Sequence, residues 1–253
     1  MSPLSVIVIT QNEEHNIREC LSTVTWAGEI IVVDSGSEDR TVERAREFTD
    51  RIFVRAWRGF GEARNFAIRQ ARGEWIFWLD ADERITHLLA EEIRKTIESL
   101  SSLAAYSVPR KSFFLGKWIR HCGWYPGRVV RLFRQDKGRF TDEKVHERLN
   151  VDGTIGELKA DLLHYTDPTL EHYFRKFNRY TSLAAEELGL NGKQFSLAKL
   201  ISKPVWTFWR MYVLRLGFLD GLHGLILSVL SAGYVFTKYA KVWERSSTKE
   251  SEE

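Results

Sequence analysis

The sequence predicts an α/β fold with a mixed, mainly parallel sheet, flanking helices and a C-terminal helical extension. Short apolar runs rich in β-branched residues alternate with helix-like repeats over the first 80 residues. Strands that alternate with helices favour a parallel sheet with right-handed crossovers. The last third of the chain is helical in pattern and mixes aromatic with basic residues. With 253 residues, of which 43% are hydrophobic, the chain can form one core and an appendage.

The expected elements follow in chain order. Apolar runs predict strands at 5–10, 29–33, 51–56 and 75–79, and helical spacing predicts helices after residue 17, at 39–48 and at 62–71. Ser37 or Asp39 would cap the helix at 39–48. Next come a helix at about 88–100, a segment at 106–110, a loop rich in aromatic and basic residues, and an alternating strand at 128–133. Short strands and turns are expected at 140–165, and helices from Glu171 onward.

Three polar clusters follow strands of the predicted sheet, at Thr10–Glu13, Asp34–Ser37 and Asp80–Asp82. Ligands of open α/β sheets bind beyond the carboxyl ends of the strands, where these clusters would meet. The chain has neither the GxGxxG spacing of dinucleotide folds nor the GxxxxGK[ST] of a P-loop. This argues against NAD and ATP enzymes.

Asp80 and Asp82 form a D-x-D pair at the end of an apolar strand. Hard divalent cations prefer carboxylate oxygen and need few protein ligands when phosphates supply the rest. The pair therefore predicts a metal-bound diphosphate, and a helix N-cap or an exposed turn is the alternative. Asp34, after the second strand, would accept a hydrogen bond from a base N–H or cap the next helix.

Arg64 and Asn65 lie near the start of a predicted helix, where a diphosphate could meet the helix N-terminus and a guanidinium. A solvated helix face is the alternative. His164 ends an apolar strand and is either a core histidine or the partner of an aspartate in a metal site.

The net charge, the cysteines and the N-terminus limit the partners and the compartment that we expect. The net charge is only +3, and many of the 32 aromatic residues cluster with Lys and Arg in the second half, which suits an anionic membrane surface better than nucleic acid. Cys20 and Cys122 have no CxxC or Cys/His ligand spacing, which favours a reduced, cytosolic chain. The N-terminus shows no basic n-region and no cleavage site, so export is not expected.

The C-terminal part predicts contact with a membrane. Its aromatic and basic residues flank an apolar stretch, as in helices that lie in the membrane interface. A hairpin packed on the domain is the alternative, because glycines there allow close approach. The stretch 216–236 approaches the length of about 20 residues that spans a bilayer, yet Asp220 and His223 favour an interfacial or packed helix over a span. Residues 246–253 are expected to be a disordered tail.

The motifs together resemble family-2 glycosyltransferases of the GT-A fold, a Rossmann-like fold. The resemblance rests on the strings SVIVITQNEE at 5–14, EIIVVDSGS at 29–37, ARN at 63–65 and GEWIFWLDADE at 73–83. Later strings, VHE at 145–147, LHY at 163–165 and GFLDG at 217–221, are similar to a branch that includes bacterial lipopolysaccharide inner-core β-1,4-glucosyltransferases. The first strand ends in Ile9-Thr10-Gln11-Asn12 instead of the usual Pro-Thr-Tyr-Asn, so no aromatic ring is expected to stack on the base there.

The resemblance implies a role for each site residue. Asp34 would read the nucleobase, Asp80 would lie near ribose and diphosphate, and Arg64 would belong to the same donor site. Thr10, Asn12 and Glu13 would line the base and ribose pocket. Asp82 would bind Mg²⁺ or Mn²⁺, with His164 as a second ligand.

The family inverts the anomeric centre in one displacement and uses a carboxylate as the base. Many members carry a Glu-Asp pair ahead of a helix for this purpose, and no such pair follows Asp82. Glu147 is therefore the expected base and Glu143 the next choice, in a cluster with Asp142 and His146 whose alternative is a charged surface.

The resulting hypothesis is a metal-dependent hexosyltransferase that moves glucose from UDP-glucose to a lipid-anchored saccharide at the inner leaflet of the inner membrane. Its catalytic domain would be 1–170, with a nucleotide-sugar half at 1–105 and an acceptor half at 106–170, followed by a membrane-associated extension at 171–245. A polyprenyl-phosphate glycosyltransferase and a non-catalytic membrane scaffold with this fold are the alternatives.

Overall fold

The computed structural model describes residues 3–99, 102–141, 148–190 and 195–250. The chain forms two compact units, Met1–Arg110 with Gly127–His164 and Lys111–Pro126 with Tyr165–Glu253. The second unit joins two separate segments of the chain, because apolar residues of the 111–126 loop share a core with the C-terminal helices. The assignment of catalytic halves at 1–105 and 106–170 stays a prediction.

The first unit contains a sheet with both parallel and antiparallel pairs, as predicted. Its strands are β1 (Leu4–Thr10), β2 (Glu29–Asp34), β3 (Ile52–Val54), β4 (Trp75–Asp80), β6 (Ala105–Val108), β9 (Val129–Arg134) and β12 (Ile155–Glu157). The order is β12-β6-β9-β4-β1-β2-β3. The pairs from β4 through β1 and β2 to β3 are parallel, and β9 runs antiparallel to β4 and β6. The carboxyl ends of β1, β2 and β4 therefore meet at one edge.

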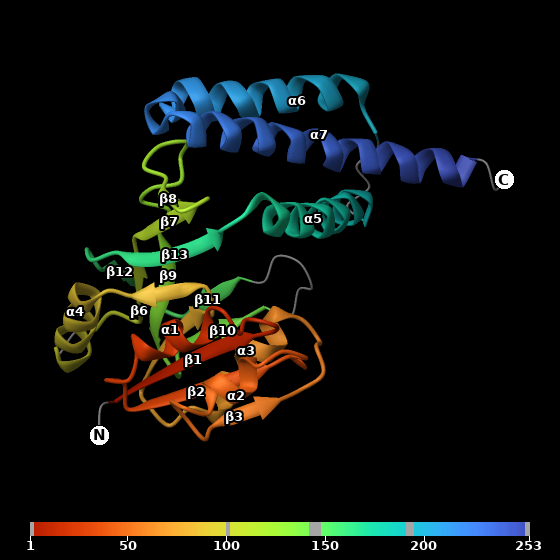
Figure 1. The fold of residues 1–253 in the computed structure, drawn as a ribbon. Coiled ribbons are helices and arrows are strands. Elements are labelled where there is room, and N and C mark those ends of the chain that lie inside the picture. Colours follow the sequence, from red (N-terminus) through yellow and green to blue (C-terminus); the bar gives the residue numbers. More distant parts are fainter. Residues whose placement is uncertain (1–2, 100–101, 142–147, 191–194, 251–253) are drawn as a thin grey trace. The chain divides into compact units, whose positions relative to one another are not determined.

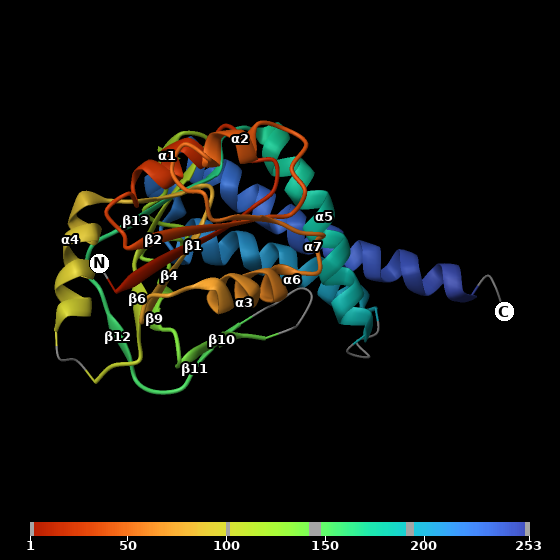
Figure 2. The ribbon, with the colours of Figure 1, turned by 90° about the horizontal axis from the view of Figure 1, so that it is seen from below.

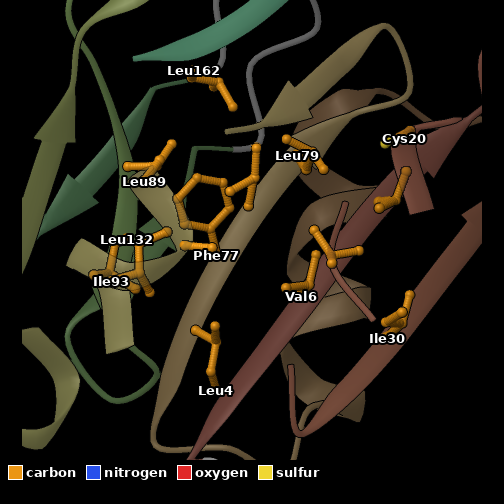
Figure 3. Packing of buried hydrophobic residues seen from close by; sticks show 14 of the residues in the cluster. Leu4, Val6, Cys20, Ile30, Phe77, Leu79, Leu89, Ile93, Leu132 and Leu162 are labelled. Carbon is orange, nitrogen blue, oxygen red and sulfur yellow. The ribbon is translucent and has the colours of Figure 1, made fainter. Parts of the chain in front are cut away.

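Helices cover both faces of this sheet, as Figure 2 shows. Their bounds are α1 (Ile17–Ser22), α2 (Thr41–Ala45), α3 (Phe60–Gln70) and α4 (His87–Glu98). Side chains alternate between faces along a strand, so each strand contributes to two cores. Val6 and Phe77 pack on the side of α1 and α4, where Figure 3 shows them, and Ile7 and Ile76 pack on the side of α3.

Four short strands complete the first unit: β5 (Glu83–Ile85), β10 (Gly138–Phe140), β11 (Leu149–Val151) and β13 (Leu162–Asp167). β13 begins in this unit and pairs antiparallel with β5, which sets His164 opposite Glu83. β5 was not predicted, because three residues directly after a D-x-D turn are too few to show a period.

The second unit consists of a hairpin and a group of helices. Its elements are β7 (Arg110–Phe114), β8 (Lys117–Trp118), α5 (Leu170–Leu190), α6 (Leu197–Trp209), the π-helix η1 (Arg210–Leu214), the 3₁₀-helix η2 (Gly217–Asp220) and α7 (Leu222–Glu250). Leu115 and Gly116 both have positive φ, as a two-residue hairpin turn requires. α6 and α7 run side by side in Figure 1.

The helices differ from the expected ranges in three places. α2 begins at Thr41 after Arg40, because Ser37 bonds to Asp34 and Asp39 bonds to Thr41 instead of capping a longer helix. The stretch 216–236 is not one helix, since a left-handed residue at Leu216 and η2 precede α7. α7 continues to Glu250, where a tail from Ser246 was expected.

Candidate active site

The loops that follow β1 and β2 are joined by hydrogen bonds. Asn12, whose φ of 55° is one that Asn tolerates, donates its backbone N–H to Ser37 Oγ at 2.8 Å and accepts from Glu38 N at 2.9 Å. The backbone N–H of Glu13 donates to Thr41 Oγ1 at 2.8 Å. Asn12 and Glu13 thus lie at the predicted edge, and these bonds hold the two loops in one conformation.

Thr10 and Asp34 are register partners at the ends of β1 and β2. Asp34 is buried, and its carboxylate accepts from the backbone N–H groups of Gly36 at 3.0 Å and Ser37 at 2.8 Å. It shapes its own loop and does not cap α2, which starts later. The Thr10 hydroxyl is buried and has no hydrogen-bond partner among the residues that the structure describes. A buried hydroxyl of this kind fits a ligand that supplies the missing bond.

Asp80 lies between two arginines. Arg64 Nη2 is 3.2 Å from Asp80 Oδ1, and Arg131 Nη2 is 3.0 Å from Asp80 Oδ2. Both guanidinium groups also lie on the Trp78 ring, at 4.1 and 3.3 Å from its centroid. Burial by itself raises the pKa of Asp80, but Arg131 and Arg64 outweigh it and hold this pKa well below its usual range. Asp80 is therefore an anion with both oxygens already paired.

Glu83 closes the turn that contains the D-x-D pair. It is fully buried, accepts from the backbone N–H of Asp80 at 3.1 Å and pairs with Arg131 Nη2 at 2.5 Å. Burial raises the pKa of Glu83, and the charge of Arg131 opposes that rise. Arg131 was not predicted as a site residue, although a charged residue inside the alternating apolar strand at 128–133 indicates a buried polar partner.

Asp82 and His164 come together from β4–β5 and β13. His164 Nε2 lies 3.3 Å from Asp82 Oδ2, and the two side chains are only 14% and 16% exposed. Arg84 donates to the carbonyl oxygens of Ala81 and Glu83, both at 2.9 Å, and so fixes the loop that carries Asp82. His164 therefore lies beside Asp82, and its role as a metal ligand stays a prediction.

Asp82 and His164 fit a divalent metal ion that is bound partly by the protein and partly by a diphosphate. One carboxylate and one imidazole are suitable donors, and diphosphate oxygens would complete the coordination. Within the described residues, no group of three or more His, Cys, Asp or Glu side chains could hold a metal by itself. Such a site depends on a bound nucleotide diphosphate for its remaining ligands.

Asn65 does not have the diphosphate role predicted beside Arg64. Its Nδ2 donates to the carbonyl of Phe140 at 2.8 Å, and its Oδ1 accepts from the backbone N–H of Phe140 at 3.0 Å. Asn65 thereby attaches β10 to α3. The expected base residues Glu147 and Glu143, with Asp142 and His146, lie outside the described residues, so their role stays a prediction.

Comparison with known proteins agrees with the fold and the motifs. The sequence model of Glycosyl transferase family 2 matches residues 5–153. The chain is 31% identical to the lipopolysaccharide core biosynthesis glycosyltransferase LpsC of Rhizobium meliloti (strain 1021), over 98% of this chain and 94% of that protein.

Two further proteins are similar over most of the chain. The uncharacterized glycosyltransferase RT0209 of Rickettsia typhi is 28% identical, over 97% of this chain and 88% of that protein. The crystal structure of S. aureus TarS 1-349 is 18% identical with a TM-score of 0.47, over 99% of this chain and 92% of that chain.

Proposed function

The chain belongs to glycosyl transferase family 2, and we propose that it moves a hexose, glucose from UDP-glucose, to a lipid-anchored saccharide such as the lipopolysaccharide inner core. The observation that carries the donor half of this proposal is the pair Asp82 and His164, 3.3 Å apart beside the arginine-bound Asp80. The similarity to LpsC, a protein named for core biosynthesis, supports the acceptor half.

Different residues would bind different parts of the donor. The buried hydroxyl of Thr10 and the loop shaped by Asp34 suit the base and ribose, with Asn12 and Glu13 on the same edge. Arg64 lies where it can meet a phosphate while it orients Asp80. Because both oxygens of Asp80 are paired with arginines, Asp82 is the better metal ligand and Asp80 suits ribose and diphosphate contacts.

The reaction would invert the anomeric centre in a single in-line displacement by the acceptor hydroxyl. A bound Mg²⁺ or Mn²⁺ would neutralise charge on the departing diphosphate. Asp82 and His164 would hold the ion, and Glu147, or Glu143 in its place, would take the proton of the acceptor hydroxyl.

The exposed apolar surface of the second unit supports an inner-leaflet location. Leu197, Ile201 and Val205 repeat every four residues along α6 and are each more than half exposed. Of the described helices, α7 over Leu222–Ser246 is the one long and apolar enough to cross a membrane, and only 17% of its most apolar window is buried. Aromatic and basic residues on these helices are typical of a bilayer interface.

Release of nucleotide from a panel of UDP- and GDP-sugars, with deacylated core saccharide as acceptor, tests the function. We expect UDP-glucose to be used above the others, and Asp82→Asn to abolish turnover while the protein still folds. Asp50→Asn, an exposed aspartate between α2 and β3, is the matched control and should keep wild-type activity. Full turnover by Asp82→Asn would overturn the metal role.

Co-sedimentation with vesicles that contain anionic lipid tests the location. Val205→Asp should lower the bound fraction roughly ten-fold, because it places a charge in the apolar face. Val54→Asp replaces a valine on β3 that is also more than half exposed, and it should leave the bound fraction unchanged. Equal loss in both variants would contradict a membrane-binding role of α6.

A further inference from the structure

The hairpin of the second unit has two different faces. Ser112, Phe114 and Ile119 are buried, and Phe114 and Ile119 join the small core with the helices. The opposite face is half-exposed and consists of rings and cations. We call it the hairpin face; its residues are Lys111, Phe113, Trp118 and Arg120, together with Tyr125 and Tyr165, which pack on its rings.

Asp220 holds the backbone at one end of the hairpin face. This buried carboxylate accepts from the backbone N–H of Arg120 at 3.2 Å and of His121 at 2.8 Å. Lys117 Nζ donates to the Asp220 carbonyl at 2.7 Å, and the backbone N–H of Cys122 donates to the carbonyl of Arg215 at 2.9 Å. The rings and cations above are therefore preorganised, as a recognition surface needs.

Two cations on this face have no anionic partner among the residues that the structure describes. Lys111 Nζ lies 3.9 Å and Arg120 Cζ 4.3 Å from the centroid of the Trp118 ring. Within the described part of the chain, neither side chain forms an ion pair or a hydrogen bond, and Trp118 Nε1 is buried without a partner. Two positive charges on one ring, without an anionic partner among the described residues, favour the binding of an anion.

The rings give the site a second property. Phe113 and Tyr165 are stacked with centroids 4.8 Å apart, and Tyr125 meets Trp118 edge-on at 5.4 Å. Half-exposed aromatic faces pack against the C–H faces of sugars and bury them with little loss of entropy. The aliphatic side chains suited to a bilayer lie instead on the helices, at Leu197, Ile201 and Val205.

We propose that the hairpin face binds the acceptor saccharide through a phosphate or carboxylate group on one of its sugars. This inference rests on the proposed function and adds the chemical class of the acceptor. Lys111 and Arg120 bind the anionic group beside the Trp118 ring, and the neighbouring rings hold the sugar that carries it.

Kinetics of the double variant Lys111→Gln/Arg120→Gln test the site, with deacylated core saccharide that retains its phosphates as acceptor. The KM for this acceptor rises roughly ten-fold, because two charge-assisted contacts are lost, whereas the KM for UDP-glucose stays the same. Lys95→Gln, an exposed lysine on α4, is the matched control and leaves both values unchanged. An unchanged acceptor KM in the double variant overturns the proposal. If that variant also binds vesicles less well, the two cations serve the membrane and not the acceptor.

Binding can be tested separately from catalysis. Titration with glucose 6-phosphate shifts the indole N–H resonance of Trp118, assigned by its absence in Trp118→Phe, and glucose at the same concentration does not. If the enzyme transfers no sugar in the donor panel, the proposed function fails while this shift still supports the anion site. Equal response to both sugars refutes the anion site whatever the transferase result.

Discussion

Replacement of Arg131 by methionine should destabilise the protein strongly. Arg131 is 1% exposed and Glu83 is 0% exposed, so solvent screens their 2.5 Å ion pair very little. Removing one partner of a buried pair costs about 3–5 kcal/mol, because the remaining charge is left without compensation. Arg110 Nη1, at 4.0 Å from Glu83 Oε1, offsets part of this loss. We therefore expect a loss of about 3 kcal/mol in the free energy of unfolding of Arg131→Met.

Urea denaturation of Arg131→Met, Glu83→Gln and the double variant measures this effect. The double variant should lose less stability than the sum of the two single variants, because the second substitution removes the charge that the first leaves unpaired. Lys137→Met breaks an exposed pair with Asp152 and serves as the control, with an unchanged transition expected. A free energy of unfolding for Arg131→Met within about 1 kcal/mol of wild type would refute a stabilising buried pair of Arg131 with Glu83.

Three other changes are predicted. His164→Gln should raise the Mn²⁺ concentration for half-maximal activity about ten-fold, measured by metal titration of UDP release; an unchanged value would remove His164 from the metal site. Gly224→Ala should lower the free energy of unfolding by about 1–3 kcal/mol, because its Cβ would lie 1.9 Å from the Gly217 carbonyl oxygen, whereas Gly233→Ala, which meets nothing within 4 Å, should raise it. Burial raises the pKa of Tyr173 to about 12. The contribution of its protonated hydroxyl to stability is therefore complete below the unfolded pKa of about 10 and is lost as the pH rises toward 12. Tyr173→Phe should flatten the decline in Tm between these pH values, and identical Tm profiles of wild type and variant would contradict this.

The strands that carry the donor site were predictable because their signal is local. Val6 to Ile9, Ile30 to Val33 and Trp75 to Leu79 are apolar on both faces, as strands covered by helices on each side must be. The residue that ends each strand follows from the same pattern. Asp34 and Asp80 could thus be assigned to one edge of the sheet without coordinates.

Other parts of the site carried no such local signal. The contact between His164 and Asp82 depends on the β5–β13 register, which turns the imidazole toward Asp82. Asn65 was expected to bind a diphosphate at the start of a helix. Its side-chain amide instead forms hydrogen bonds to the backbone of Phe140, which is distant in sequence. Asp220 argued against a membrane span for 216–236, but its bonds to the hairpin backbone could not be foreseen.

The sequence by itself determined the α/β class, the family and the polar edge that holds Asp34, Asp80 and Asp82. Periodicity and the motifs at strand ends depend on residues close together in the sequence, so they can be recognised in a single sequence. Only the tertiary structure decided that Arg131 pairs with Asp80 and Glu83. Buried charges take partners through strand register and packing between distant segments, and a one-residue shift of register would exchange every partner.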